Sequence, residues 1–178
     1  GSTEAPTYVK DITLENASIV TDNIRRTAYV GVLIGEALGG TGSISGCCVG
    51  GEINCQTAAG DIAAGGMIGH INPISNVAES IQIRDCIASV TVQGNYNEGG
   101  GFAGAVSEGA SISNCGATGA VTMNEPYNGY TSPVAGGFIG ALTLANDTPC
   151  CIQDCYATGD VQVNASTDTY QGTGGFIG

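Results

Sequence analysis

The sequence predicts an all-β fold, a parallel β-solenoid (β-helix) of about four to five coils. Three observations lead to this prediction: a glycine-rich block recurs along the chain, a cysteine motif follows each block, and a short apolar segment follows each cysteine. The glycine-rich block ends at five positions, spaced by 34 to 38 residues: Gly35, Gly69, Gly104, Gly140 and Gly178. Short blocks that recur at a nearly constant period indicate units that stack on one another.

Each repeat contains three blocks joined by connectors of variable length. The glycine-rich block reads Gly-Gly-Phe-Ile-Gly in its clearest copies, which end at Gly140 and Gly178. The cysteine motif reads Ile-x-x-Cys, and the third block reads Ala-Thr-Gly-x-Val-x-Met or Ala-Thr-Gly-x-Val-x-Val in residues 117–123 and 157–163. Because the blocks are fixed and the connectors vary, we expect insertions to leave the stack as loops on one face.

The blocks are too short for helices, which need about 10–12 residues with a 3.6-residue period. The alternation of apolar and polar residues in 121–123 and 161–163 is typical of strands. We therefore expect two or three short strands in each unit, with equivalent residues of successive units stacked in columns. Three inward columns are expected: Leu33, Met67, Phe102, Phe138 and Phe176; Cys47, Cys86, Cys115 and Cys155; and Ile44, Ile83, Ile112 and Ile152.

The charge of the chain argues against nucleic acid as a ligand. The chain has sixteen acidic residues and only four Lys and Arg residues, which gives a formal net charge of −12. Binding to a phosphate backbone, or to an anionic membrane surface, requires clustered Lys and Arg, and these are absent. The chain has no run of 18 apolar residues, so no membrane insertion is expected. A charged fraction of only 11% is typical of extracellular β proteins. We interpret the negative charge as a feature that keeps a secreted bacterial protein soluble.

The eight cysteines divide into two groups. The four in the column are interpreted as buried thiols, which behave as small hydrophobic residues. One cysteine per repeat, all in line and without a CxxC pair, does not provide the tetrahedral cage that zinc requires, so no metal site is predicted. Cys48, Cys55, Cys150 and Cys151 lie outside the column, where a surface disulfide and free thiols are both open.

The candidates for catalytic chemistry are few. His70 is the chain's one histidine and follows a closing glycine, where we expect a solvated loop. Asp85, Asn114 and Asp154 each precede a column cysteine; we interpret them as turn residues, since Asp and Asn accept local backbone hydrogen bonds. A row of catalytic acids, as in polysaccharide-degrading β-helices, is the alternative. We predict no catalytic residues and no cofactor.

The connectors hold the residues best suited to binding. Exposed tyrosines beside Asn and Gly favour contact with protein or glycan, although they also pack loops against a solenoid wall; the connector tyrosines are Tyr96, Tyr127, Tyr130 and Tyr170. Oxygen-rich segments that calcium could bind are residues 95–98 and 124–128, and the neighbourhoods of Asp147 and Asp168. None of these segments has the spacing of a known calcium loop.

The blocks resemble the GLUG motif, a short repeat of bacterial surface proteins with a Gly-Leu-x-Gly core that Asn-Cys-Tyr-Ala-Thr-Gly often follows. The best matches are Gly137-Phe138-Ile139-Gly140 with Asp154-Cys155-Tyr156-Ala157-Thr158-Gly159, and Gly101-Phe102-Ala103-Gly104 with Asn114-Cys115-Gly116-Ala117-Thr118-Gly119. The first two copies depart from the pattern: Val32 replaces a glycine, and Ala88-Ser89-Val90 replaces Ala-Thr-Gly. The resemblance, over residues 29–178, implies a β-solenoid stalk or adhesive region of a large secreted or wall-anchored protein. GLUG repeats also occur in IgA-specific metallopeptidases, but the motif is not their catalytic part.

The repeats suggest how the chain is organised. Residues 1–28 are expected to form a divergent coil or an N-terminal cap, and residues 29–178 the GLUG-like repeats, with boundaries at about 29–63, 64–98, 99–134, 135–173 and a further unit that begins at 174–178. Because the sequence stops inside a repeat, we expect that the native chain continues or that the open edge pairs with a neighbouring molecule.

These observations favour a non-catalytic repeat module of an extracellular or cell-surface bacterial protein. It would act as a structural stalk, or as an adhesion region whose partner is a protein or glycan of a host or neighbouring cell. The rest of a longer parent chain is a further expected partner. The alternative is a carbohydrate-active enzyme domain on a β-helix scaffold.

Overall fold

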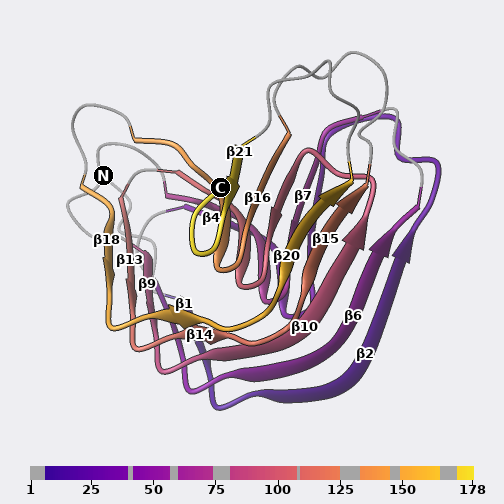
Figure 1. The fold of residues 1–178 in the computed structure, drawn as a ribbon. Helices are drawn as coiled ribbons and strands as arrows, with labels where there is room; N and C mark the ends of the chain where they lie inside the picture. The colour runs from indigo at the N-terminus through magenta and orange to yellow at the C-terminus, as the bar shows by residue number, and fades with distance from the viewer. Residues whose placement is uncertain are drawn as a thin grey trace.

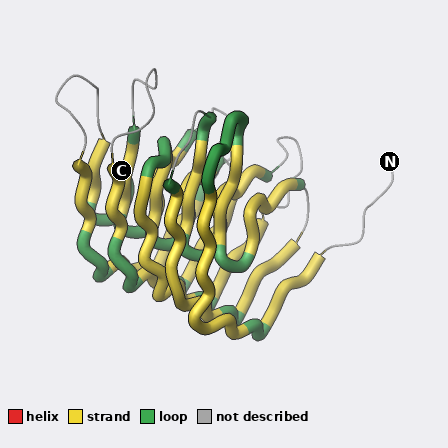
Figure 2. The backbone as a smooth tube through the Cα atoms, turned by 90° about the vertical axis from the view of Figure 1, so that its right-hand side faces the viewer, coloured by secondary structure: helices red, strands yellow, loops and turns green. Residues whose placement is uncertain are grey.

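The computed structural model describes residues 7–39, 42–56, 60–73, 81–107, 109–124, 133–144, 149–164 and 172–178. Within these residues every regular element is a β-strand, and the strands form four parallel sheets. Each sheet takes strands from successive coils, so that the coils stack in register (Figures 1 and 2). The prediction of an all-β parallel solenoid is therefore confirmed. No described segment forms a helix of the length and apolarity needed to span a membrane.

We number the sheets in the order in which one coil visits them. Sheet 1 contains β1 (Thr7–Lys10), β5 (Gly42–Ser45), β9 (Ile81–Arg84), β13 (Ala110–Ser113) and β18 (Cys151–Gln153). Sheet 2 contains β2 (Thr13–Thr21), β6 (Cys48–Cys55), β10 (Ile87–Gly94), β14 (Gly116–Ala117), β15 (Val121–Asn124), β19 (Tyr156–Ala157) and β20 (Val161–Asn164). Sheet 3 contains β3 (Ala28–Gly31), β7 (Ile62–Gly65), β11 (Glu98–Gly100), β16 (Val134–Gly136) and β21 (Gly172–Gly174). Sheet 4 contains β4 (Ile34–Leu38), β8 (Ile68–Asn72), β12 (Ala103–Val106) and β17 (Ile139–Leu142).

The coil is folded inward rather than being a simple ring. Sheets 1 and 2 form an outer trough, and sheets 3 and 4 run into it and back out (Figure 1). The corner between sheets 3 and 4 reaches the inner face of sheet 2, where a Cβ on Gly101 would lie 3.0 Å from the Cβ of Ala117. The expectation of two or three strands per unit was wrong, because the glycine-rich block is a corner with a strand on each side.

Variation in connector length is confined to two of the four corners. Sheet 1 always passes to sheet 2 through two residues, such as Asp85 and Cys86, and sheet 3 passes to sheet 4 through two, such as Gly66 and Met67. The connections from sheet 2 to sheet 3 and from sheet 4 back to sheet 1 differ in length between coils. Insertions thus enter at two corners, from sheet 2 to sheet 3 and from sheet 4 to sheet 1, and both corners lie along the open side of the trough (Figure 1).

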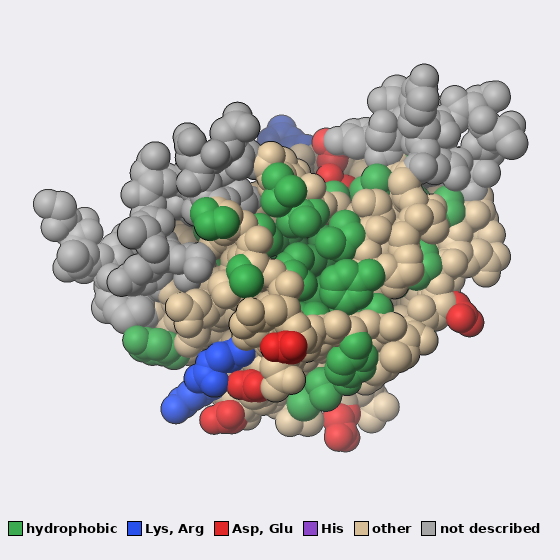
Figure 3. All heavy atoms as spheres, turned by 60° about the vertical axis from the view of Figure 1, so that its left-hand side comes forward, with side chains coloured by type: hydrophobic (Ala, Val, Ile, Leu, Met, Phe, Trp, Pro, Cys, Tyr) green, Lys and Arg blue, Asp and Glu red, His purple; other side chains and the backbone are tan. Residues whose placement is uncertain are grey.

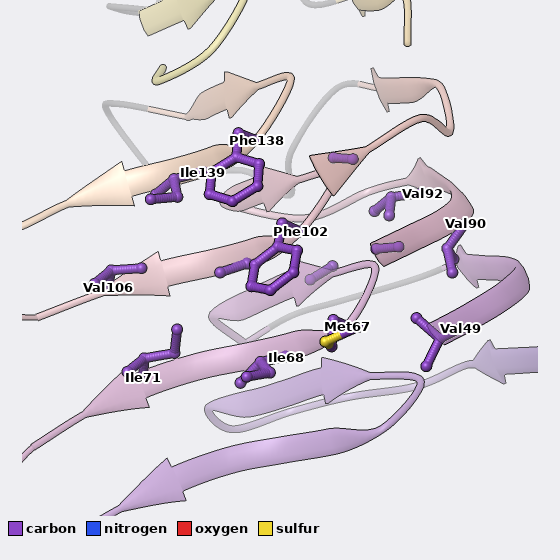
Figure 4. Packing of buried hydrophobic residues seen from close by; sticks show 14 of the residues in the cluster. Val49, Met67, Ile68, Ile71, Val90, Val92, Phe102, Val106, Phe138 and Ile139 are labelled. Carbon is purple, nitrogen blue, oxygen red and sulfur yellow. The ribbon is translucent and has the colours of Figure 1, made fainter. Parts of the chain in front are cut away.

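The predicted columns form part of the core. Met67, Phe102 and Phe138 are fully buried and follow one another through the stack, opposite Val49, Val90 and Val92 of sheet 2 (Figure 4). The Phe102 and Phe138 rings stack with centroids 4.7 Å apart, and the Phe138 and Phe176 rings with centroids 4.8 Å apart. Leu33 and Phe176, at the two ends of this column, are half-buried. The isoleucine column is also in register, with Ile83 paired to Ile44 and Ile112.

Sheets 3 and 4 lie so close together that only glycine fits at one position of each corner. A Cβ on Gly104 would lie 2.6 Å from the backbone nitrogen of Ala64 and 2.7 Å from the carbonyl oxygen of Gly69. Gly69 and Gly140 face backbone in the same way. The closing glycine of each block is therefore required by the contact of two backbones.

The N-terminal segment forms the first coil. β1 pairs with β5, and β2 pairs with β6 with one irregularity between Leu14 and Ala17. Asp11 and Ile12 lie between β1 and β2, in the positions that Asp85 and Cys86 occupy two coils later. Ile12 thus takes the place of a column cysteine.

Candidate functional site

A group of polar side chains connects sheets 3 and 4. In sheet 4, Glu36 pairs in register with His70. In sheet 3, Tyr29 and Glu98 lie on one face, in a column with Ala63 between them. The Tyr29 ring packs against the His70 ring with centroids 4.6 Å apart, so the cluster joins the two sheets.

His70 links three coils through its two ring nitrogens. Nδ1 lies 3.5 Å from Oε1 of Glu36 in β4, and Nε2 lies 3.2 Å from Oγ of Ser107, which follows β12. The His70 side chain is 13% exposed, and its Nδ1 is buried without a hydrogen-bond partner among the described residues. The prediction of a solvated loop histidine was wrong, because the residue after the closing glycine continues into strand β8.

Burial dominates the electrostatics of this cluster. Burial lowers the pKa of His70, and the neighbouring Glu36 carboxylate opposes this effect in part. Burial also raises the pKa of Glu98, with a further contribution from Asp61. The pKa of Tyr29 is raised by burial and then by Glu36, Glu98 and Asp61. At neutral pH the site therefore holds a neutral imidazole among acidic groups.

The order carboxylate, imidazole, hydroxyl is that of a nucleophilic triad, in which the imidazole accepts the hydroxyl proton. Catalysis of acyl transfer also needs N–H donors for the oxyanion. The backbone N–H of Ser107 instead donates to the Ile71 carbonyl at 2.8 Å, and Tyr29 covers the imidazole. This geometry favours a structural role, in which His70 ties adjacent coils together.

We predict that His70 makes the protein less stable in mild acid. Because the folded pKa lies below 6.5, the unfolded chain binds the proton first, and stability is lost as the pH falls from 6.5 through the folded value. Glu98 acts oppositely: its raised folded pKa contributes stability below 4.5 that is lost as the pH rises. Urea unfolding of the wild-type protein and of His70→Gln, at pH values on either side of 6.5, separates the two effects. The variant should lose the decline below 6.5; an equal decline in both proteins would contradict the assignment.

The residues that precede the column cysteines form turns, as the sequence indicated. Asp85, Asn114 and Asp154 have φ values of 58°, 52° and 53°. Asp11 has the same conformation, and Gly46 has it in the second coil. Asp and Asn tolerate this left-handed region better than other non-glycine residues. Asn114 also donates to Oδ1 of Asp85 at 2.6 Å. These stacked turn residues therefore stabilise the corner between sheets 1 and 2.

The column cysteines are thiols held by backbone carbonyls. Cys47, Cys86 and Cys115 are fully buried, and Cys155 is half-buried. Each Sγ–H donates to the carbonyl oxygen of the residue two positions earlier, at 3.1–3.3 Å. All eight cysteines are free, so the structure contains no surface disulfide.

Thiol titration tests this arrangement. Only Cys48 and Cys151 are exposed, and burial raises the pKa of Cys55 and Cys150. Because the thiolate is the reactive form, a bulky aromatic disulfide reagent should modify Cys48 and Cys151 rapidly and the others slowly. After denaturation without reductant, all eight thiols should react. A smaller final number would reveal a disulfide.

The one connector tyrosine that the structure describes points inward. Tyr96 is 1% exposed and fills the space above Gly99, where an added Cβ would overlap the ring. Next to it, Oδ1 of Asn97 accepts from the backbone N–H of Ile62 at 2.9 Å. Residues 95–98 are thus a packed connection. Tyr127, Tyr130, Tyr170, Asp147 and Asp168 lie outside the described residues.

Alignment of the repeats contained a signal for the His70 cluster. Glu36 and His70 each follow a closing glycine directly, so they occupy the same position of successive units. Ala105 and Ala141 occupy that position in the later units. Glu and His thus stand in two neighbouring coils at a position that is alanine in the later coils. This difference marks the place where the contact between sheets 3 and 4 becomes polar. Ser107 gave no such signal, because it lies two residues beyond Ala105, the residue that pairs with His70 in register.

In the part of the chain that the structure describes, no three His, Cys, Asp or Glu side chains converge as a metal site would require. Comparison with models of protein families, with curated proteins and with solved structures finds no match to this chain.

Proposed function

We propose that the chain is a non-catalytic solenoid module of a secreted or cell-surface bacterial protein, where it acts as a rigid stalk segment with an adhesive face. One observation carries this proposal: the corner between sheets 3 and 4 repeats the same backbone pairing between successive described coils, whereas the connections at two other corners vary in length. A scaffold that conserves its walls and varies its connectors is typical of repeat proteins that extend or bind. The resemblance to GLUG repeats supports the same function.

The outer face of sheet 2 is the surface best suited to adhesion. Its side chains are mainly neutral amides and hydroxyls that are already ordered: Thr118 donates to Ser89 at 2.8 Å, and Gln162 to Asn164 at 2.7 Å. The Tyr156 ring lies over Gly116 and is 46% exposed. An ordered polar surface around an exposed aromatic ring suits a neutral glycan, since sugar rings stack on aromatic faces and hydrogen-bond to amides.

The rival function, a carbohydrate-active enzyme, needs two carboxylates that cooperate across a glycosidic bond. Asp85 and Asp154 lie in different coils with Asn114 between them, and all three hold turns. Asp85 also pairs with Arg84 at 3.0 Å. These contacts favour the structural function for this column.

The experiment is a screen of the intact chain on arrays of glycans and host surface proteins. We expect saturable binding that Tyr156→Ala abolishes and that Gln82→Ala, on the exposed face of sheet 1, leaves unchanged. Loss of binding in both variants, or in neither, would contradict the assignment to sheet 2. Mass spectrometry of the bound glycan checks the class of function, because a shortened product would overturn the non-catalytic proposal.

A further inference from the structure

We propose that the cysteine column binds a soft univalent metal ion, Cu(I), between the sulfur atoms of Cys86 and Cys115, where the ion would join two neighbouring coils. This inference goes beyond the stalk and adhesive function, because it assigns a ligand to the interior of the module. Among the described residues no three ligands converge on one point, which argues against a tetrahedral zinc site. Cu(I) prefers thiolates, and two of them on opposite sides of the ion are a sufficient set.

The first argument is the distance between the two sulfur atoms. Cys86 and Cys115 directly precede Ile87 and Gly116, which pair in register, so the two side chains lie one coil apart. The phenylalanine column shows the spacing of successive coils, since its ring centroids are 4.7 and 4.8 Å apart. A metal–thiolate bond is about 2.3 Å long for zinc, so two such bonds in a line span about 4.6 Å. An ion of similar size therefore fits between sulfurs that are one coil apart.

The second argument is the polar surroundings of these sulfurs. Cys86 Sγ lies 3.1 Å from the carbonyl oxygen of Arg84 and 3.9 Å from that of Ile44, and Cys115 Sγ has the equivalent two contacts at 3.2 and 3.9 Å. Both thiols are fully buried. Carbonyl oxygens carry the negative ends of peptide dipoles, and their attraction for a cation is strong where water is excluded. The column therefore favours a positive ion beside the sulfurs.

The third argument is that this pair of thiols can lose its protons. Hydrogen bonding with the Cys115 thiol lowers the pKa of Cys86 to about 7, against the effect of burial. The same hydrogen bond raises the pKa of Cys115, because the Cys86 thiolate holds its proton. Once Cys86 is ionised, a cation that binds thiolates can take the place of the proton that the two sulfurs share. In Cys47 and Cys155 burial is instead the main influence and raises the pKa, so the middle pair is the favoured site.

The surface charge favours the approach of a cation. Asp85 and Asp154 are exposed at the corner that contains the column, directly before Cys86 and Cys155. Acidic side chains gather along the lower edge of the face drawn in Figure 3, and the formal net charge of the chain is −12. A negative field of this kind raises the local concentration of cations.

Binding involves no oxidation or reduction. Two bonds form between Cu(I) and sulfur, and the protons of the two thiols pass to the solvent, so the bound pair carries one negative charge. The backbone N–H groups of Cys47 and Cys86, which donate to the sulfurs of Cys86 and Cys115, stabilise that charge. Because protons are released, binding should weaken as the pH falls below about 7.

Anaerobic titration tests the site. The intact, reduced chain is titrated with Cu(I) in competition with a coloured Cu(I) chelator, and X-ray absorption of the product identifies the atoms bound to the ion. We expect one ion per chain that the chelator does not remove, with two sulfur neighbours. The double variant Cys86→Ser/Cys115→Ser should lose this ion, because no two adjacent column cysteines remain. Cys47→Ser/Cys155→Ser keeps the middle pair and should retain the ion, as should Cys48→Ser, which removes an exposed thiol.

Circular dichroism without metal checks that the serine variants fold, and X-ray absorption of the wild-type protein decides the ligands independently of any variant. The proposal is overturned if the wild type retains no ion, or if the ion has oxygen or nitrogen neighbours. Retention by Cys86→Ser/Cys115→Ser, or loss by Cys47→Ser/Cys155→Ser, would overturn it equally. The glycan arrays contain no copper, so the adhesive proposal can fail without affecting this one.

Discussion

Replacement of Gly101 by alanine is expected to lower the free energy of unfolding by about 3 kcal/mol, the upper part of the usual range for overpacking a tight interior. The added Cβ would overlap the carbonyl oxygen of Gly137 in the next coil and lie 3.0 Å from the Cβ of Ala117 in sheet 2. The first of these is backbone held on both sides by hydrogen bonds, so it cannot move without separating two coils. Urea unfolding monitored by circular dichroism measures the loss.

The matched control is Gly175→Ala, at the same position of the last block. Nothing lies within 4 Å of its added Cβ, so the substitution has no steric cost within one chain. Alanine also restricts the unfolded chain, which should raise the free energy of unfolding by up to about 1 kcal/mol. Equal losses of unfolding free energy in the two variants would show that the block requires glycine for its backbone conformation, and not because of contact between coils.

The parts of the fold that follow from register could be predicted from the sequence. Once the repeats are aligned, residues at the same position must stack, so the columns of Phe102, Cys86 and Ile83 follow directly. The turn function of Asp85 was predictable for a related reason. Its conformation depends on its own side chain and its neighbours, and not on distant contacts.

The parts that depend on contacts between sheets could not be predicted in this way. The glycine-rich block combines apolar strand residues with glycines, and its composition does not indicate a corner. It becomes one because the backbones of sheets 3 and 4 contact each other at Gly104. His70 is buried because Tyr29 of sheet 3 faces it, and no repeat pattern relates these two positions. Tyr96 turns inward because Gly99 leaves the room for its ring. In each case the missing information was the distance between two sheets that the sequence describes separately.

Truncation of Phe138 to alanine is expected to lower the free energy of unfolding by about 4 kcal/mol, as for other fully buried aromatic residues. Phe138 is fully buried and stacks on Phe102 and on Phe176, so the variant loses two aromatic contacts and leaves a cavity between coils. Phe176→Ala should lose only about 1–2 kcal/mol, because that ring is part-exposed and has one stacked neighbour.

The repeats themselves supply the conservative control for this position. The first two coils use Leu33 and Met67 where later coils use phenylalanine, and Met67 is fully buried. Phe138→Met should therefore cost about 1 kcal/mol, the usual result for an apolar exchange of similar volume. Because each coil contacts only its neighbours, a cavity at Phe138 should also separate the unfolding of the last coil from the rest, which broadens the urea transition or divides it in two. A single sharp transition with equal losses for Phe138→Ala and Phe176→Ala would mean that the stacked rings do not couple the coils, and that the backbone hydrogen bonds between coils suffice.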